Sequence, residues 1–343
     1  MKPQMQRVRS RPRGKGKIGR VYLFDVLPRH APLLLGAMRA VALADGVESP
    51  KERVLLETAR DALGLAGPVE GFPTVAADSP RLLELDAAER ERLIQTMILM
   101  AVMDGTGAKE EAALVSAFAE RLGVTEPRIA NLQDLARGRV AFMKFDLTRK
   151  GYAKSEFLAT AREEGLAGLY MTFGPLAGLG HDATVTRKYN DLGLLPEGTL
   201  GRTYWDFIVR HELDFPGEGA IGERGVWHDM IHVVGGYGVD PVGEAEVVAF
   251  MSGFRDEDPF FWVFTSVLQF QVGLRISPFA PGVPDAIDPR SYLDHHRRGT
   301  KVACDLSRDW DYEADFATPL EELRARFNVL PLESCVARTA RSS

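Results

Sequence analysis

The sequence is poor in cysteine and has no long hydrophobic run. Its 343 residues include two cysteines, Cys304 and Cys335, which are too far apart for a Cys-x-x-Cys motif. We therefore expect neither a disulfide framework nor a cysteine zinc site. The longest apolar run, residues 260–270, is shorter than the about 18–20 residues that a membrane-spanning helix needs. No apolar segment follows the first basic residues, so we expect no secretory signal and an intracellular, soluble protein.

Acidic residues are absent from the first 24 positions. This basic arm holds eight lysine and arginine residues, so it carries a charge of +8. Because the whole chain has a formal net charge of −6, residues 25–343 carry −14. An acidic body does not favour nucleic-acid binding, and we expect no nucleic-acid partner. The arm can contact an anionic membrane or a nucleic acid, and it can equally be a solvated, flexible tail.

Two similar segments near the N-terminus form an internal repeat. The first copy begins at Met38 (MRAVALADGVESPKERVLLETARDALGL) and the second at Met97 (MILMAVMDGTGAKEEAALVSAFAERLGV), with a constant offset of 59. Each copy predicts an apolar helix, a stop at Asp-Gly and an amphipathic helix that ends at glycine. Glycine favours that place because it adopts the left-handed conformation without a Cβ penalty. Residues 25–135 are therefore expected to form a small domain of two related helical hairpins.

Each copy also carries an aspartate and, seven residues later, a glutamate. These are Asp45 and Glu52 in the first copy and Asp104 and Glu111 in the second. The four carboxylates could converge on a metal ion, but helix capping explains the same residues. Ser49 and Glu52 have the spacing of a capping box, so we favour capping.

The paired Asp-Gly turns and the helix lengths make residues 30–130 resemble the tellurite-resistance TerB-like helical domain. This resemblance implies an interaction or sensing module. A short link is expected near residues 136–150, then a helix over residues 156–170. Apolar spacing stays mostly helical beyond Thr199, and β-branched alternation is scarce. We expect an all-α fold with two helical domains, the second over residues 150–330, and a tail over residues 331–343.

Residues 227–250, WHDMIHVVGGYGVDPVGEAEVVAF, carry the strongest chemical pattern. His228 and His232 are four positions apart, so on a helix they share one face and can reach one metal ion. Asp229 lies close to them in angle. Glu244 is expected near the start of the next helix, where it can fold back over the site. Two imidazoles with one or two carboxylates suit zinc, iron or manganese, and they leave positions open for water or substrate.

This pattern leaves alternatives open. Iron would allow redox chemistry, whereas zinc acts only as a Lewis acid or by activating water. Without a metal, the histidines would be partly buried helix residues with a salt bridge to Asp229. A metallopeptidase is disfavoured, because the general base that usually follows the first histidine is glutamate and here it is Asp229.

The same residues resemble the signature of the ubiquinone (coenzyme Q) biosynthesis protein four family, in which HDxxH is followed after eleven residues by glutamate. Residues 194–215 are similar to the P-x-G-T-L-G-x-x-Y helix start of that family. Residues 297–329 are similar to its closing pattern around a tryptophan, here Trp310. The likeness covers residues 150–330. Since members do not usually carry an N-terminal repeat, the chain resembles a fusion.

The resemblance implies a metal site, zinc in the family, at the four catalytic residues His228, Asp229, His232 and Glu244. It implies a lyase that removes the C1 carboxylate, with or without hydroxylation, from a polyprenylated aromatic quinone precursor. The alternative is a non-catalytic prenyl-lipid-binding organiser of other quinone-biosynthesis proteins, with a structural metal. In either case we expect a cytoplasmic homo-oligomer, peripheral at the inner face of the membrane.

A helical apolar face is the candidate for a prenyl channel. It consists of Phe261, Phe264, Leu268 and Val272, at helical spacing. Each buried CH₂ group of a lipid tail contributes about 0.8 kcal/mol, so a channel could hold a prenyl lipid without a membrane span. For any one of these residues, plain core is the favoured alternative. Arg202 is a candidate to bind the carboxylate or phosphate of the head group.

Overall fold

The computed structural model describes residues 22–150, 182–218, 225–276 and 280–332. These ranges contain α-helices and short 3-10 helices, and no strand. The expected all-α fold is therefore confirmed. The basic arm up to residue 21, the helix expected over residues 156–170 and the tail from residue 333 lie outside the described residues.

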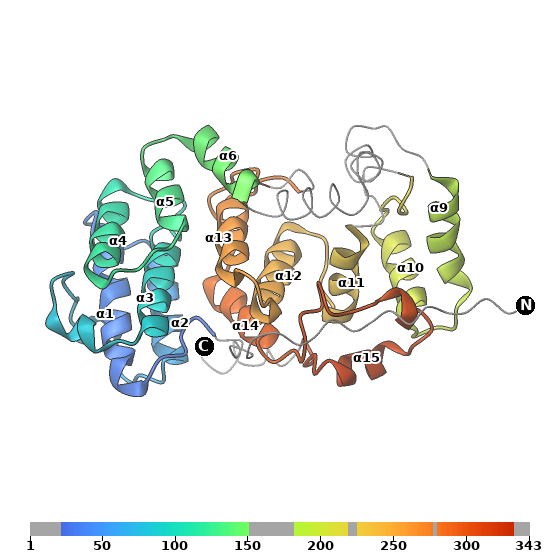
Figure 1. Cartoon of the computed structure of the whole chain (residues 1–343), viewed down its shortest axis with the longest axis horizontal. Helices are drawn as coiled ribbons and strands as arrows, with labels where there is room; N and C mark the ends of the chain where they lie inside the picture. The colour runs from blue at the N-terminus through green and yellow to red at the C-terminus, as the bar shows by residue number, and fades with distance from the viewer. Residues whose placement is uncertain (1–21, 151–181, 219–224, 277–279, 333–343) are drawn as a thin grey trace, which may run out of the picture.

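The repeat forms two helical hairpins at one end of the molecule (Figure 1). They are built from α1 (Ala31–Ala42), α2 (Pro50–Ala62), α3 (Ala87–Met100) and α4 (Lys109–Leu122). Gly46 and Gly105, in the two Asp-Gly turns, have φ values of 90° and 89°. Gly64 and Gly123, after the second helix of each copy, have φ values of 69° and 67°. The two copies thus share the backbone conformation at both glycine positions, and the hairpin prediction is confirmed.

The predicted link contains a helix. After α5 (Arg128–Ala136), the chain forms α6 (Val140–Lys150), because Met143 and Leu147 lie four residues apart and bury one face. Met143 is 0% and Leu147 is 3% exposed. The structure thus places a helix within residues 136–150, and the role of this segment as a link between two domains stays a prediction.

The C-terminal half is a second group of helices, which begins at the far end of the molecule, reaches the repeat at α13 and α14, and turns back to end at α15 (Figure 1). Its elements are α9 (Ala183–Asn190), α10 (Leu200–Arg210), α11 (Val226–Gly235), α12 (Pro241–Phe254), α13 (Pro259–Phe270), α14 (Pro289–Gly299) and α15 (Leu320–Arg326). Helices α12 and α14 meet through Gly253 and Gly299. A Cβ at Gly299 would lie 2.0 Å from the carbonyl oxygen of Phe250, so only glycine allows this approach.

Two apolar cores hold these helices together. The first joins α1–α6 to side chains of α12, α13 and α14, so the repeat packs directly against the C-terminal half. The second lies among α10, α11, α12 and α15. The boundary between two domains near residues 135–150 stays a prediction, since the first core spans it.

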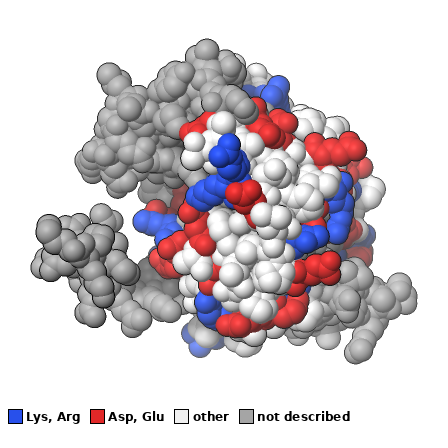
Figure 2. Space-filling view, turned by 90° about the vertical axis from the view of Figure 1, so that its right-hand side faces the viewer, with Lys and Arg blue, Asp and Glu red and all other residues white. Residues whose placement is uncertain are grey.

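The surface at the end formed by α9 and α10 carries no large area of one charge sign. Lysine and arginine lie interspersed with aspartate and glutamate around an uncharged area (Figure 2). Within the described ranges, no helix is both long and apolar enough to cross a bilayer.

Candidate metal centre

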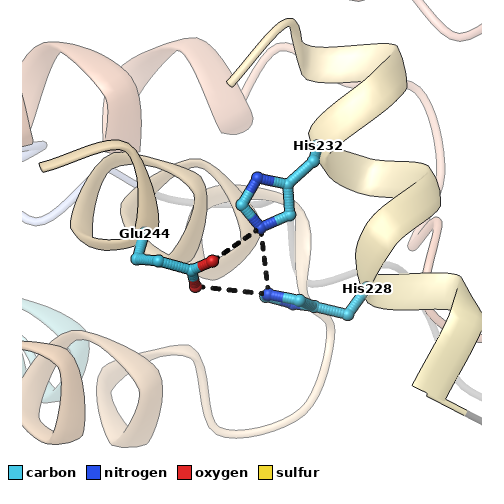
Figure 3. Close-up of side chains that lie close together, drawn as sticks. All are labelled: His228, His232 and Glu244. Carbon is cyan, nitrogen blue, oxygen red and sulfur yellow. Dashed lines mark hydrogen bonds and ion pairs between the residues drawn. The ribbon is translucent and has the colours of Figure 1, made fainter. Parts of the chain in front are cut away.

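Three of the four predicted ligands converge on one point. His228 and His232 project from α11, and Glu244 reaches them from the first turn of α12 (Figure 3). The two Nε2 atoms of the histidines lie 3.1 Å apart. The Glu244 carboxylate places Oε2 3.6 Å from Nε2 of His228 and Oε1 3.4 Å from Nε2 of His232.

The turn between α11 and α12 brings Glu244 to the histidines. Helix α11 ends at Gly235 and is capped by Gly236, whose φ of 81° is left-handed. The side chain of Asp240 then caps α12 by accepting hydrogen bonds from the backbone amides of Val242 and Gly243. A Cβ at Gly243 would lie 2.4 Å from the carbonyl oxygen of Gly238, so glycine is required for this tight return.

The spacing of the donor atoms fits a metal ion. Zinc binds histidine nitrogen at about 2.0–2.1 Å and carboxylate oxygen at about 2.0–2.2 Å, usually in tetrahedral geometry. Donors in such a tetrahedron are therefore about 3.3–3.5 Å apart. The distances of 3.1, 3.4 and 3.6 Å between the three side chains lie around that length. Within the described part of the chain, these are the residues whose ligand atoms gather closely enough to hold a metal ion.

The protonation of two of the three groups, His232 and Glu244, suits a cation. Burial opposes the charged form of His228, but the hydrogen bond and charge of Glu244 outweigh it and raise the pKa of this histidine. Burial and the charge of His228 lower the pKa of His232 to about 4. Burial opposes ionisation of Glu244, but the hydrogen bond and charge of His228 outweigh it, so its pKa is lowered. His232 and Glu244 therefore favour the forms in which they bind metals, a neutral imidazole and an ionised carboxylate, whereas metal binding by His228 competes with its proton.

Asp229 stands apart from the three converging side chains. It is not among the residues whose ligand atoms lie within 4.8 Å of one another. Its Oδ2 instead accepts a long hydrogen bond of 3.5 Å from the hydroxyl of Tyr204, on α10. The next residue on a helix is rotated by about 100°, and the short aspartate side chain does not bridge that angle. Burial, with the charge of Glu244, raises the pKa of Asp229 to about 6.

The cluster is reached from the side of His228 and Glu244. Their side chains are 31% and 21% exposed, whereas that of His232 is 1% exposed. The ring of Trp227 packs edge-on against His228 at 5.8 Å between centroids. The guanidinium of Arg255 lies over Trp227, and 4.4 Å from the ring centre of Trp262.

Sequence reasoning missed this group of aromatic and cationic side chains. The signal in the sequence was Trp227, directly before the HDxxH segment; Arg255 and Trp262 lie beyond α12 and gave none.

The predicted lipid-binding residues lie elsewhere. Phe264 and Leu268 are 1% and 0% exposed and pack in the first core, with Phe261 and Val272 against its edge. The side chains that surround the histidines belong to the second core. The structure therefore does not bring this face to the metal centre, and the prenyl channel stays a prediction.

Arg202 is engaged by α10 and by the segment just before it. It donates to Asp206 at 3.1 Å and to the carbonyl oxygen of Gly193 at 3.2 Å. Its guanidinium also lies over the ring of Trp205. Head-group binding by Arg202 stays a prediction. It would require Arg202 to give up these contacts in favour of the head group.

The acidic residues of the repeat accept hydrogen bonds from backbone amides, in agreement with the capping role that the sequence analysis favoured over a metal site. Ser49 and Glu52 form the predicted capping box of α2. Asp45 and Asp104 accept hydrogen bonds from the backbone amides two residues later.

The two glutamates of the repeat are in contact. The buried carboxyl groups of Glu52 and Glu111 hydrogen-bond to each other. Burial, together with the charges of Asp104 and Glu52, raises the pKa of Glu111 to about 9. The pair therefore retains a proton at neutral pH.

No family model matches the chain, and no curated protein matches its sequence.

Proposed function

We propose that this chain is a metal-dependent lyase of the quinone-biosynthesis type. It removes the C1 carboxylate, with or without hydroxylation, from a polyprenylated aromatic acid at a membrane surface. His228, His232 and Glu244 would hold the metal ion, which is zinc by family resemblance, with iron and manganese as alternatives. The observation that carries the proposal is the convergence of these three side chains at distances of 3.1–3.6 Å.

The residues around the cluster have the chemistry that decarboxylation needs. A bound metal ion supplies Lewis acidity to the substrate or activates water. When CO₂ leaves, its bonding electron pair stays on the ring carbon, which must then take up a proton. Asp229, with its pKa raised to about 6, is the group beside the cluster that can carry this proton. Arg255, held between Trp227 and Trp262, supplies a cation for the substrate carboxylate.

The number of converging ligands favours catalysis over a purely structural metal. Structural zinc sites are closed by four protein ligands, whereas catalytic sites have three and keep a position open. The alternative of a non-catalytic prenyl-lipid organiser with a structural metal would need a fourth ligand. Asp229 is the nearest in sequence, but its carboxylate is hydrogen-bonded to Tyr204.

The substitution Asp229→Asn tests the proposal. In the metal-loaded full chain, we expect it to retain the metal and to lower CO₂ release from a polyprenylated aromatic acid by at least about 100-fold. Asp206→Asn, on the neighbouring helix α10, is the matched control and should retain activity. Loss of the metal in Asp229→Asn would make Asp229 a ligand and favour the organiser. Metal-loaded wild-type protein that binds the prenylated acid but releases no CO₂ would overturn the proposal.

A further inference from the structure

Helix α6 exposes two phenylalanine side chains to solvent. Phe142 is 62% and Phe145 is 64% exposed. They are three residues apart, so they lie side by side on one face of the helix. Single exposed apolar side chains are ordinary on a protein surface, whereas these two aromatic rings together form one apolar patch on the helix.

The opposite face of α6 is fixed to the protein. Met143 and Leu147 are buried in the first core, where α6 packs on α5. Asn131 of α5 also donates a hydrogen bond of 3.2 Å to Asp146. The helix cannot turn its phenylalanines inward without losing these contacts. Figure 1 shows α6 at the upper edge of the molecule, beside α5.

The segment of the sequence that carries the two rings is rich in basic residues. Residues 137–150 hold five basic residues and one acidic residue, in a chain whose formal net charge is −6. The acidic residue is Asp146, which faces Asn131. Arg137 and Arg139 are exposed just before the helix, although Arg139 pairs with Asp134 at 2.5 Å. Aromatic side chains flanked by lysine and arginine are typical of helices that lie in the interface of an anionic bilayer.

We propose that α6 docks the protein on an anionic lipid bilayer by inserting the rings of Phe142 and Phe145 among the lipids. The alternative partner for this surface, a second copy of the chain, is disfavoured. That contact would bring two segments of like charge together, whereas an anionic bilayer neutralises them. The inference rests on the proposed function in one respect, namely that a prenylated substrate resides in a membrane. It goes beyond that function by assigning the docking element, which lies outside the metal centre.

Vesicle binding of the full chain tests the docking surface. We expect the protein to sediment with vesicles of phosphatidylcholine and phosphatidylglycerol, and much less with phosphatidylcholine alone. The double variant Phe142→Ser/Phe145→Ser should lower the partition coefficient at least about tenfold, because two inserted rings are lost. Leu194→Ser is the matched control, since Leu194 is 86% exposed on another surface, and its binding should stay within about twofold of wild type.

Two outcomes would overturn the inference. One is equal vesicle binding by the wild type and the double variant. The other is a wild-type dimer that the double variant abolishes while vesicle binding is unchanged. The measurement needs neither substrate nor turnover, and the metal-site variant His228→Ala/His232→Ala should still bind vesicles. Failure of docking and failure of the lyase proposal can therefore be told apart.

Discussion

Glu244 joins the two histidines from a different helix, so the metal centre depends on this one carboxylate. Glu244→Gln keeps the size of the side chain and removes its charge. We expect the variant to bind zinc at least about tenfold more weakly, because a neutral amide is a poor metal ligand. Glu246→Gln, two residues further along α12, should bind zinc as the wild type does, since Glu246 contacts Ser291 and His295 instead. Competition with a chromogenic chelator measures both affinities, and equal affinities would exclude Glu244 as a ligand.

Tyr204 contributes to the pKa of Asp229. Its hydroxyl stabilises the ionised carboxylate, which limits the rise in the pKa that burial causes. In Tyr204→Phe, we expect the pKa of Asp229 to rise further above 6. Activity that needs the protonated acid would then persist to higher pH, so the alkaline limb of the pH–rate profile should move upward. A profile that moves to lower pH would contradict this role.

At the scale of elements, the contact between the two repeats carries a pH dependence. The pKa of Glu111 is about 9 in the folded protein, against a reference value of 4.5. Because the folded value is the higher one, the stabilising contribution is complete below about pH 4.5 and is lost as pH rises through about 9. The free energy of unfolding should therefore fall between these values, by at most about 1.4 kcal/mol per pH unit for this group.

Glu111→Gln tests this dependence, because an amide can still hydrogen-bond to Glu52 but does not titrate. Urea denaturation at pH 5, 7 and 9 should give a flatter stability profile for this variant than for the wild type. Glu110→Gln, at the exposed neighbouring position, should keep the wild-type slope. An unchanged slope in Glu111→Gln would mean that the buried pair does not hold the proton.

The close approach of α12 and α14 predicts that a larger residue at their contact lowers the stability of the protein. Gly299→Ala places a methyl group against the carbonyl oxygen of Phe250, a backbone atom that cannot turn aside. We expect a loss of about 3 kcal/mol in the free energy of unfolding. Gly71→Ala has open space around its Cβ and should change stability by less than about 1 kcal/mol. Equal denaturation midpoints for the two variants would contradict the tight helix contact.

At the scale of the whole molecule, the features that local sequence patterns determine were predicted, whereas those that long-range packing determines were not. The all-α fold, the hairpin repeat and the capping box at Ser49 follow from helical periods and turn residues. His228 and His232 were predictable because their spacing places them on one helix face. Glu244 was predictable as their partner because only a short turn separates the two helices that carry these three residues.

Features that depend on distant partners were not predictable. Asp229 turns toward Tyr204, which lies 25 residues earlier on another helix. Helix α6 was missed because Gly138 precedes it and basic residues interrupt its apolar pattern, so that the burial of Met143 and Leu147 in the first core is not evident from the sequence. The apolar period of Phe264 and Leu268 shows that one face is buried, but it does not tell which core buries it.

The central claim is that His228, His232 and Glu244 bind one metal ion, and elemental analysis of the purified full chain tests it most directly. The wild type should contain about one equivalent of zinc, iron or manganese, which the double variant His228→Ala/His232→Ala loses. His211→Ala removes a histidine outside the cluster and should retain the metal. A wild type that binds no metal after reconstitution, or a double variant that binds as much as the wild type, would contradict the account.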